Sequence, residues 1–288
     1  MRMTRIGFVT CVQLGLVCME AIYRIGGRLE LAVTLHDHLG QRKSGRVYID
    51  GFCARNAIDL IKIGNVNEHT VIDAVVAKQI DWLLIIGWSQ IARKPLLDAP
   101  ALGTLGIHPT LLPEGRGRAS IPWAILKGLK RTGVTLFKLD EGVDTGEIVA
   151  HEVLPIAPDE TAYSLYKRVQ LAHEILIEQV WAPLSDGAIC LMPQDEGSAS
   201  QWPARTPEDG RITAQMNCQD IDRLVRATTH PYPGAFFDTS SHRYRIWAGV
   251  AECEQAHFQF LHSDGRTLEI PATDGQFIAT EWAEEEKV

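Results

Sequence analysis

Short apolar runs alternate with helical patterns over residues 5–181, and this alternation is the strongest constraint on the fold. Between the runs, apolar residues recur three and four positions apart, which is the period of an amphipathic helix. The predicted strands are 5–11, 29–37, 81–88, 103–109, 132–140 and 146–156. This order predicts an α/β domain of Rossmann-like type, in which a parallel sheet lies between two layers of helices.

The rest of the chain follows another pattern. A long amphipathic helix is predicted over 159–181 and would close the first domain. Its apolar stripe consists of Leu165, Val169, Ala172, Leu176 and Val180. Short alternating strands then continue to the acidic run 284–288, which we expect to be solvated. We therefore predict an α/β domain over 1–184, a linker over 185–204 and a small antiparallel, barrel-like β domain over 205–288.

The composition is that of a soluble globular protein, with 45% apolar and 22% charged residues. The net charge of −8 argues against nucleic acid as a partner, and the basic stretch 41–46 is expected to be a solvated loop. The six cysteines lack the paired spacing of a zinc site or a disulfide framework, so we expect reduced thiols and no metal. Neither a signal peptide nor a membrane span is predicted, which favours a cytoplasmic location.

Candidate chemistry is concentrated at the ends of successive predicted strands. His108 ends the strand 103–109, a Gly-Arg-Gly-Arg loop follows it, and Asp144 lies in the loop after the strand 132–140. Because the carboxyl ends of neighbouring parallel strands meet at one edge, we expect His108 and Asp144 to be close together. A carboxylate beside an imidazole suits general acid–base catalysis, although a histidine after a strand also fits an ordinary surface or core position.

One contiguous segment extends this interpretation. HPTLLPEGRGRASIPWAILKGLKRTGVTLFKLDEGVDTGEIV, residues 108–149, resembles the 10-formyltetrahydrofolate-dependent formyltransferases in its HPTLLP stretch, its Arg-Gly loop and its DEGVDTG loop. Further along, ARTPEDGRI and RATTHPYPGAF resemble the linker and the start of the C-terminal domain in methionyl-tRNA and amino-sugar formyltransferases. The resemblance implies that 1–184 is the catalytic domain and that 10-formyltetrahydrofolate is the formyl donor.

The resemblance also implies roles for particular residues. His108 would be the acid–base residue, and Asp144 would position it and help to relay the proton. Substrate phosphate oxygens would be bound around Arg116, Gly117 and Arg118, although both arginines also fit packing or a pair with Glu114. No metal is implied. The folate would lie on backbone groups of Gln90, Ile91, Leu139, Asp140, Glu141, Gly142 and Val143.

Position 106 departs from the family pattern. These enzymes usually have Asn-x-His, whose amide donates to the formyl oxygen, whereas this chain has Gly106-Ile107-His108. Loss of one such donor typically costs a factor of about 10²–10³ in rate. Three explanations remain open: His108 with a bound water stabilises the oxyanion, Ser89 or Gln90 supplies the donor, or the chain binds its ligands without efficient transfer.

The resemblance leaves several substrates open. We predict transfer to the amine of a nucleotide-linked amino sugar, in polysaccharide biosynthesis, because the THPYPGAF segment is closer to the amino-sugar enzymes and the chain is acidic. The alternatives are a methionyl-tRNA formyltransferase and a catalytically weak or silent protein that binds folate and nucleotide sugar. The exposed edges expected in the C-terminal β domain make a homodimer possible.

Overall fold

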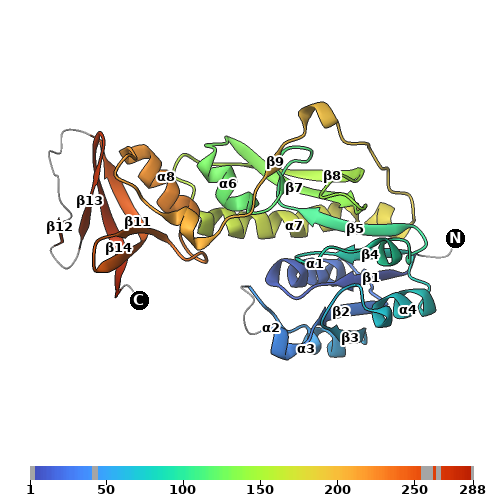
Figure 1. Cartoon of the computed structure of the whole chain (residues 1–288). Helices are drawn as coiled ribbons and strands as arrows, with labels where there is room; N and C mark the ends of the chain where they lie inside the picture. Colours follow the sequence, from blue (N-terminus) through green and yellow to red (C-terminus); the bar gives the residue numbers. More distant parts are fainter. Residues whose placement is uncertain (1–3, 41–44, 254–261, 264–266, 287–288) are drawn as a thin grey trace. The chain divides into compact units, whose positions relative to one another are not determined.

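The computed structural model describes residues 4–40, 45–253, 262–263 and 267–286 (Figure 1). The chain divides into two compact units that are interleaved along the sequence. The first comprises 1–117, 133–154 and 168–201, and the second comprises 118–132, 155–167 and 202–288. Each unit is considered by itself below.

The first unit is built on a seven-stranded sheet of order β3-β2-β1-β4-β5-β7-β8. Its strands are β1 (Ile6–Val9), β2 (Leu31–Leu35), β3 (Asp59–Ile63), β4 (Trp82–Ile85), β5 (Gly103–His108), β7 (Arg131–Lys138) and β8 (Ile148–Pro155). The five strands from β3 to β5 run parallel, so the carboxyl ends of β1, β2, β4 and β5 meet at one edge of the sheet. A further short pair joins β6 (Arg116–Gly117) to β9 (Gln201–Trp202).

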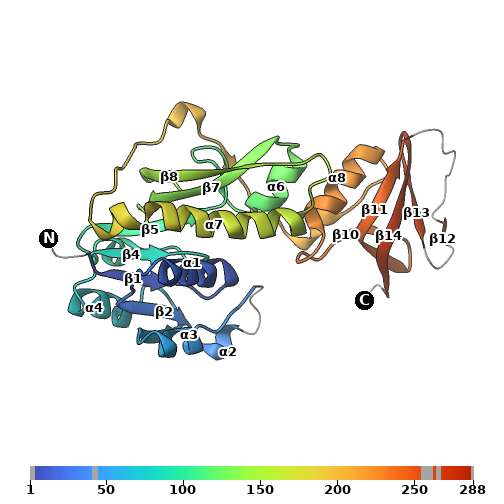
Figure 2. The same cartoon turned by 180° about the vertical axis from the view of Figure 1, so that it is seen from behind.

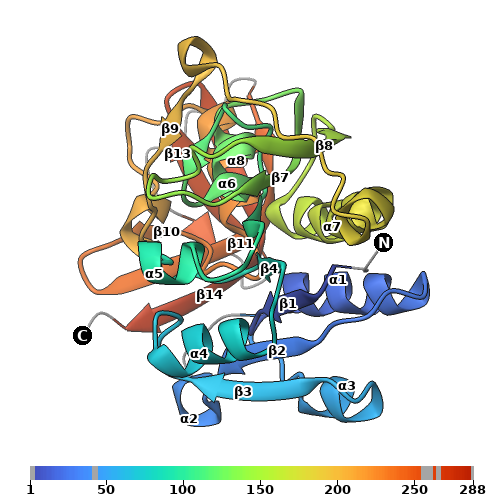
Figure 3. The same ribbon diagram turned by 90° about the vertical axis from the view of Figure 1, so that its right-hand side faces the viewer.

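Helices cover both faces of this sheet (Figures 2 and 3). The helices of the first unit are α1 (Gln13–Arg24), α2 (Asp37–Gly40), α3 (Asp50–Arg55), α4 (His69–Ala77), α5 (Lys94–Leu97) and most of α7 (Ala162–Ser185), with the 3₁₀ turn η1 (Glu196–Ser198). Arg24 of α1 pairs with Glu174 and Glu178 of α7, which fixes these two helices on the same face. On the other face of the sheet, Val, Leu and Ile side chains from β1, β2, β4 and α4 pack together in a buried core.

The second unit carries a five-stranded sheet of order β10-β11-β14-β13-β12, whose paired strands are antiparallel. Its strands are β10 (Ala235–Asp238), β11 (His242–Glu252), β12 (His262–Ser263), β13 (Leu268–Ala272) and β14 (Gly275–Glu286). The helices are α6 (Ser120–Leu126), α8 (Cys218–Thr228) and the 3₁₀ turn η2 (Pro207–Gly210). Apolar residues of α8, among them Ile221 and Leu224, pack on Phe277 of the sheet and form a second core.

The predicted fold class is confirmed: a largely parallel α/β sheet is followed by an antiparallel β unit. The apolar stripe of the long helix is also buried as predicted. The elements α3 and β3 were not predicted from the sequence, and neither were the shorter elements α2, α5, β6 and β9. The strand β3 carries Asp59 and Lys62 at an edge of the sheet, so its apolar run is too short to stand out in the sequence.

Two local expectations are wrong. The strand β7 is antiparallel to β5, with Leu105 opposite Lys138 and His108 opposite Thr135. Arg46, expected in a solvated loop, is buried and donates to Thr34 and to the carbonyl oxygen of Leu35; residues 41–44 of that stretch lie outside the described part. The acidic run begins within β14, where Glu284 and Glu286 are exposed to solvent as expected.

No helix among the described residues is both long enough and apolar enough to cross a bilayer.

Candidate active site

His108 and Asp144 lie side by side in the first unit. His108 Nδ1 is 3.5 Å from Asp144 Oδ2, and both side chains are largely buried. On the other side of the ring, Nε2 lies 2.8 Å from the carbonyl oxygen of Gly115. A carbonyl oxygen only accepts hydrogen bonds, so this contact places a proton on Nε2 and leaves Nδ1 facing the carboxylate. The arrangement suits an imidazole that takes up a second proton at Nδ1.

The structure brings this pair together by a route that differs from the predicted one. Because β7 is antiparallel to β5, its carboxyl end lies beside the start of β5 and not beside His108. The loop after β7 instead folds back, and Lys138 N–H donates to the carbonyl oxygen of Glu147 across its base. Asp144 has a φ of +57°, a left-handed conformation that aspartate tolerates better than most residues. Its Oδ2 accepts the Gly117 N–H at 2.8 Å, which fixes the carboxylate beside the imidazole.

Arg116 is held by residues that the sequence analysis assigned to the linker. Its guanidinium donates to Gln194 Oε1 and to both carboxylate oxygens of Glu196, and its side chain is 9% exposed. Gln194 in turn donates to the carbonyl oxygens of Asp144 and Gly146. The segment around 194–196 therefore braces the Asp144 loop. Its only sequence signal was a polar cluster that also fits a linker.

The remaining predicted substrate residues differ in their setting. Gly117 contributes its backbone N–H to Asp144. Arg118 is exposed, and its backbone N–H donates to Trp202 within the second unit. The contacts of Arg116, Gly117 and Arg118 with a substrate remain predictions.

The residues predicted to hold the folate lie in two loops of the first unit. The Gln90 side chain accepts from Val66 N–H and donates to the carbonyl oxygen of Gly64, so it fastens the loop after β4 to the loop after β3. Ile91 beside it is 67% exposed. In the loop after β7, Asp140 Oδ1 accepts from Gly142 N–H and from the Thr145 hydroxyl, while Glu141 is exposed and Val143 is 48% exposed.

Gly106 is buried in β5, two residues before His108 and therefore on the same face of the strand. A Cβ atom at this position would lie 2.8 Å from Leu139 Cδ2 and 3.3 Å from Leu139 Cγ. Leu139 thus occupies the space that a side chain at position 106 would enter.

Two further histidines of the first unit, His173 and His151, have pKa values that desolvation lowers. His173 of α7 is 1% exposed, and its Nδ1 lies 2.7 Å from the carbonyl oxygen of Val169. Burial, with a smaller contribution from His108, lowers the pKa of His173 to about 4. Burial also lowers the pKa of His151, partly offset by a hydrogen bond to the Leu112 backbone. Neither residue was singled out from the sequence, because a single histidine in a helix such as α7 or a strand such as β8 gives no signal of its surroundings.

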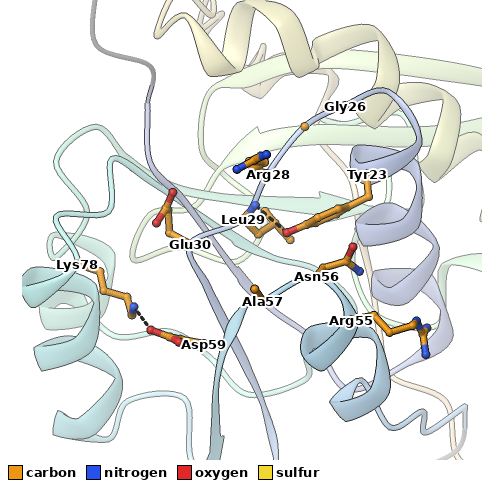
Figure 4. A pocket seen from close by; sticks show the side chains of 11 residues that line it. Tyr23, Gly26, Arg28, Leu29, Glu30, Arg55, Asn56, Ala57, Asp59 and Lys78 are labelled. Carbon is orange, nitrogen blue, oxygen red and sulfur yellow. Dashed lines mark hydrogen bonds and ion pairs between the residues drawn. The ribbon is translucent and has the colours of Figure 1, made fainter.

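A separate cleft of about 660 Å³ opens in the first unit (Figure 4). It is lined by residues that precede β2 and β3, including Arg28, Glu30, Arg55 and Asn56. These positions lie at the amino ends of the parallel strands, whereas His108 ends β5. None of the predicted site residues lines this cleft.

The sequence of this chain matches those of known proteins. Residues 52–180 match the Formyl transferase family, and residues 205–284 match the family described as Formyl transferase, C-terminal domain. The methionyl-tRNA formyltransferase of Koribacter versatilis is 35% identical over 224 residues, which cover 76% of this chain and 70% of that protein.

Solved structures share the fold. The N-formyltransferase from Helicobacter canadensis, solved with folinic acid and dTDP-3-aminofucose, has a TM-score of 0.74 at 18% identity and covers 98% of this chain and 100% of its own. The methionyl-tRNA formyltransferase from Clostridium thermocellum has a TM-score of 0.62 at 17% identity, with coverage of 99% and 100%.

The fold and the family matches define a formyl-transferring enzyme of the α/β class. The chain belongs to the formyltransferase family.

Proposed function

We propose that the protein transfers a formyl group from 10-formyltetrahydrofolate to the amine of a nucleotide-linked amino sugar. Family membership supports the formyl transfer. The amino sugar is chosen as the acceptor because the C-terminal part of the chain is acidic. Residues 205–288 contain 8 Lys and Arg against 14 Asp and Glu. An acidic surface repels a phosphate backbone and leaves a small diphosphate-linked substrate as the better acceptor.

In this proposal His108 accepts the proton that the amine loses as its nitrogen bonds to the formyl carbon. The Nε2 proton stays on Nε2, hydrogen-bonded to the Gly115 carbonyl oxygen, so the proton from the amine is received at Nδ1. It then lies between the ring and Asp144 Oδ2, which stabilises the imidazolium. The same proton can return to the nitrogen of the leaving folate.

The folate supplies the formyl carbon that the amine attacks. The exposed side chains of Ile91 and Val143 fit this ligand, since neither contributes to a core and an aromatic ring system would shield both from water. Their loops belong to the same unit as His108 and Asp144. Backbone groups of residues 139–143, with Gln90 fastened in place, would orient the ring.

Stabilisation of the formyl oxygen must differ from the family pattern. Leu139 fills the space next to Gly106, so an apolar side chain lies where an amide donor would be. Gln90 already bonds residues 64 and 66, which leaves it little freedom to replace that amide. We therefore assign the stabilisation of the oxyanion to a hydrogen bond from water and to the positive charge of the protonated His108 ring.

Methionyl-tRNA formylation is the second candidate, because the sequence relatives at 35% and 30% identity carry that name. Its acceptor would require several contacts with phosphates, and the rate at low substrate would then fall steeply with salt concentration. A nucleotide sugar with one diphosphate would show a much shallower dependence.

The test measures tetrahydrofolate release with a panel of nucleotide-linked amino sugars and with methionyl-tRNA, each at several salt concentrations. We expect turnover with at least one nucleotide-linked amino sugar, a rate that depends only weakly on salt concentration, and loss of turnover in His108→Ala. Turnover only with methionyl-tRNA would replace the sugar by the tRNA. Thermal stabilisation by folate without turnover on any amine would identify a binding protein instead of an enzyme.

A further inference from the structure

A second cluster of reactive side chains lies in the C-terminal unit. The Sγ atoms of Cys218 and Cys253 and a carboxylate oxygen of Asp274 lie within 4.8 Å of one another. Cys218 is the first residue of α8, Cys253 follows β11, and Asp274 lies in the turn between β13 and β14. Three segments far apart in the sequence thus present metal-binding groups to one point.

Close backbone packing produces this convergence. A Cβ atom at Gly275 would lie 2.1 Å from the carbonyl oxygen of Glu252 and 2.9 Å from Cys218 Sγ, so a side chain there would force the segments apart. Asp274 Oδ1 accepts the Cys218 N–H at 2.7 Å and ties the turn to the start of α8. The cluster is therefore fixed by the fold and does not depend on the placement of flexible side chains alone.

We propose that Cys218, Cys253 and Asp274 bind one zinc-type divalent cation. Thiolates select zinc among the common divalent ions, and a carboxylate oxygen is also one of its ligands. When ionised, the three groups would repel one another at this separation, and a divalent cation removes that repulsion.

Binding releases the thiol protons to solvent, and water completes the tetrahedral coordination. Cys218 is buried whereas Cys253 and Asp274 are exposed, so the ion enters from the solvent side. The site is independent of the formyl-transfer chemistry. The cation would clamp the start of α8 to the end of β11 and to the β13–β14 turn.

The experiment uses the full-length protein, freed of metal by a chelator and kept reduced. Zn²⁺ is added and its stoichiometry measured, and Co²⁺ serves as a spectroscopic probe whose charge-transfer absorption reports thiolate ligands. We expect one ion per chain, a thiolate–Co²⁺ band and an increase in melting temperature with Zn²⁺. The variants Cys253→Ser and Asp274→Asn should each weaken Zn²⁺ binding by about 100-fold.

Matched controls separate this site from others. Cys190→Ser removes another exposed cysteine and should leave binding unchanged. Both ligand variants alter exposed groups, and Asn retains an acceptor for the Cys218 N–H, so the fold should persist by circular dichroism. Absence of stoichiometric Zn²⁺, or binding retained in Cys253→Ser, would overturn the proposal. So would a reversible Cys218–Cys253 disulfide in protein that binds no zinc.

Discussion

His108 and Arg116 of the first unit are largely buried, whereas His230 and His242 of the C-terminal unit lie at the surface. The side chains of His108 and Arg116 are 10% and 9% exposed, but those of His230 and His242 on the C-terminal unit are 55% and 37% exposed. Around His108 and Arg116 several partners are backbone carbonyls or side-chain amides fixed by further hydrogen bonds. On β11 and β14 they are the carboxylates of facing strand residues, as in Arg245–Glu285.

This difference in burial indicates where the loss of a charged group should affect stability or activity most. A buried polar group that loses its partner keeps its desolvation cost, so changes near His108 should be expensive. An exposed ion pair is screened by water and salt and contributes between about 0 and 1 kcal/mol. The predictions below contrast the two regions in order of decreasing effect.

The largest effect is expected for His108→Ala. Loss of the proton acceptor should lower kcat by about 10²–10⁴-fold, the usual contribution of general acid–base catalysis. Tetrahydrofolate release under saturating substrate measures it. The matched control His230→Ala alters an exposed histidine of the C-terminal unit and should retain full turnover. Equal turnover in both variants would contradict the role of His108.

A pH effect on stability is expected from His173. Its pKa is lowered to about 4 in the folded state by burial, while that of an exposed histidine is near 6.5. The unfolded chain therefore takes up this proton before the folded one, and the free energy of unfolding falls by about 3 kcal/mol at most as pH drops from 6.5 towards 4. Denaturant unfolding of His173→Gln should show a flatter pH dependence over that window.

The control for this prediction is His242→Gln, which alters an exposed histidine. It should leave the pH dependence as it is in the natural sequence. A profile that His173→Gln does not flatten would mean that other groups cause the acid lability.

A smaller effect on activity is expected for Asp144→Asn. The amide oxygen can still accept the Gly117 N–H, so the loop should keep its conformation, but the negative charge beside His108 is lost. A hydrogen bond to a charged group contributes about 1.5–3 kcal/mol, which corresponds to a fall of about 10–100-fold in kcat. Unchanged turnover, measured with an unchanged melting temperature, would remove Asp144 from the mechanism.

A substitution at position 106 tests how closely Leu139 packs against this part of β5. Gly106→Asn alone should destabilise the protein by about 1–3 kcal/mol, because the new side chain meets Leu139. The double variant Gly106→Asn/Leu139→Ala should be more stable than the two single effects predict and should turn over faster than Gly106→Asn. Stability is measured by denaturant unfolding and turnover by tetrahydrofolate release. Simple additivity of the two changes would show that Leu139 does not occupy that space.

The smallest effect is expected for Arg245→Ala, which removes the pair with Glu285. The free energy of unfolding should fall by no more than about 1 kcal/mol, and less at high salt. For comparison, Arg116→Ala leaves Gln194 Oε1 without its donor and should cost about 2 kcal/mol. Thermal or denaturant unfolding of both variants measures the two losses of stability. A larger loss in Arg245→Ala than in Arg116→Ala would contradict the proposed effect of burial.

Particular residues show which features could be predicted from the sequence and which could not. Local patterns located most strands, the long helix and the antiparallel C-terminal sheet, because side-chain period reports which face is buried. They failed at β3, whose edge position tolerates charged residues, and at Arg46, whose burial depends on acceptors in β2 and in the segment that follows β1. Gln194 and Glu196 were assigned to a linker since nothing in the chain order indicates that they brace Arg116.

The sequence alone established the α/β class and the membership of the formyltransferase family, because both follow from local pattern and contiguous motifs. It also predicted that His108 and Asp144 are close together, although the parallel strand arrangement behind that prediction is wrong. Only the tertiary structure decided that β7 runs antiparallel and that the Asp144 loop folds back to reach His108. It also decided that Leu139 fills the space beside Gly106 and that Cys218, Cys253 and Asp274 converge. These features depend on which distant segments pack together, and that choice arises from burial over the whole core and leaves no local periodicity.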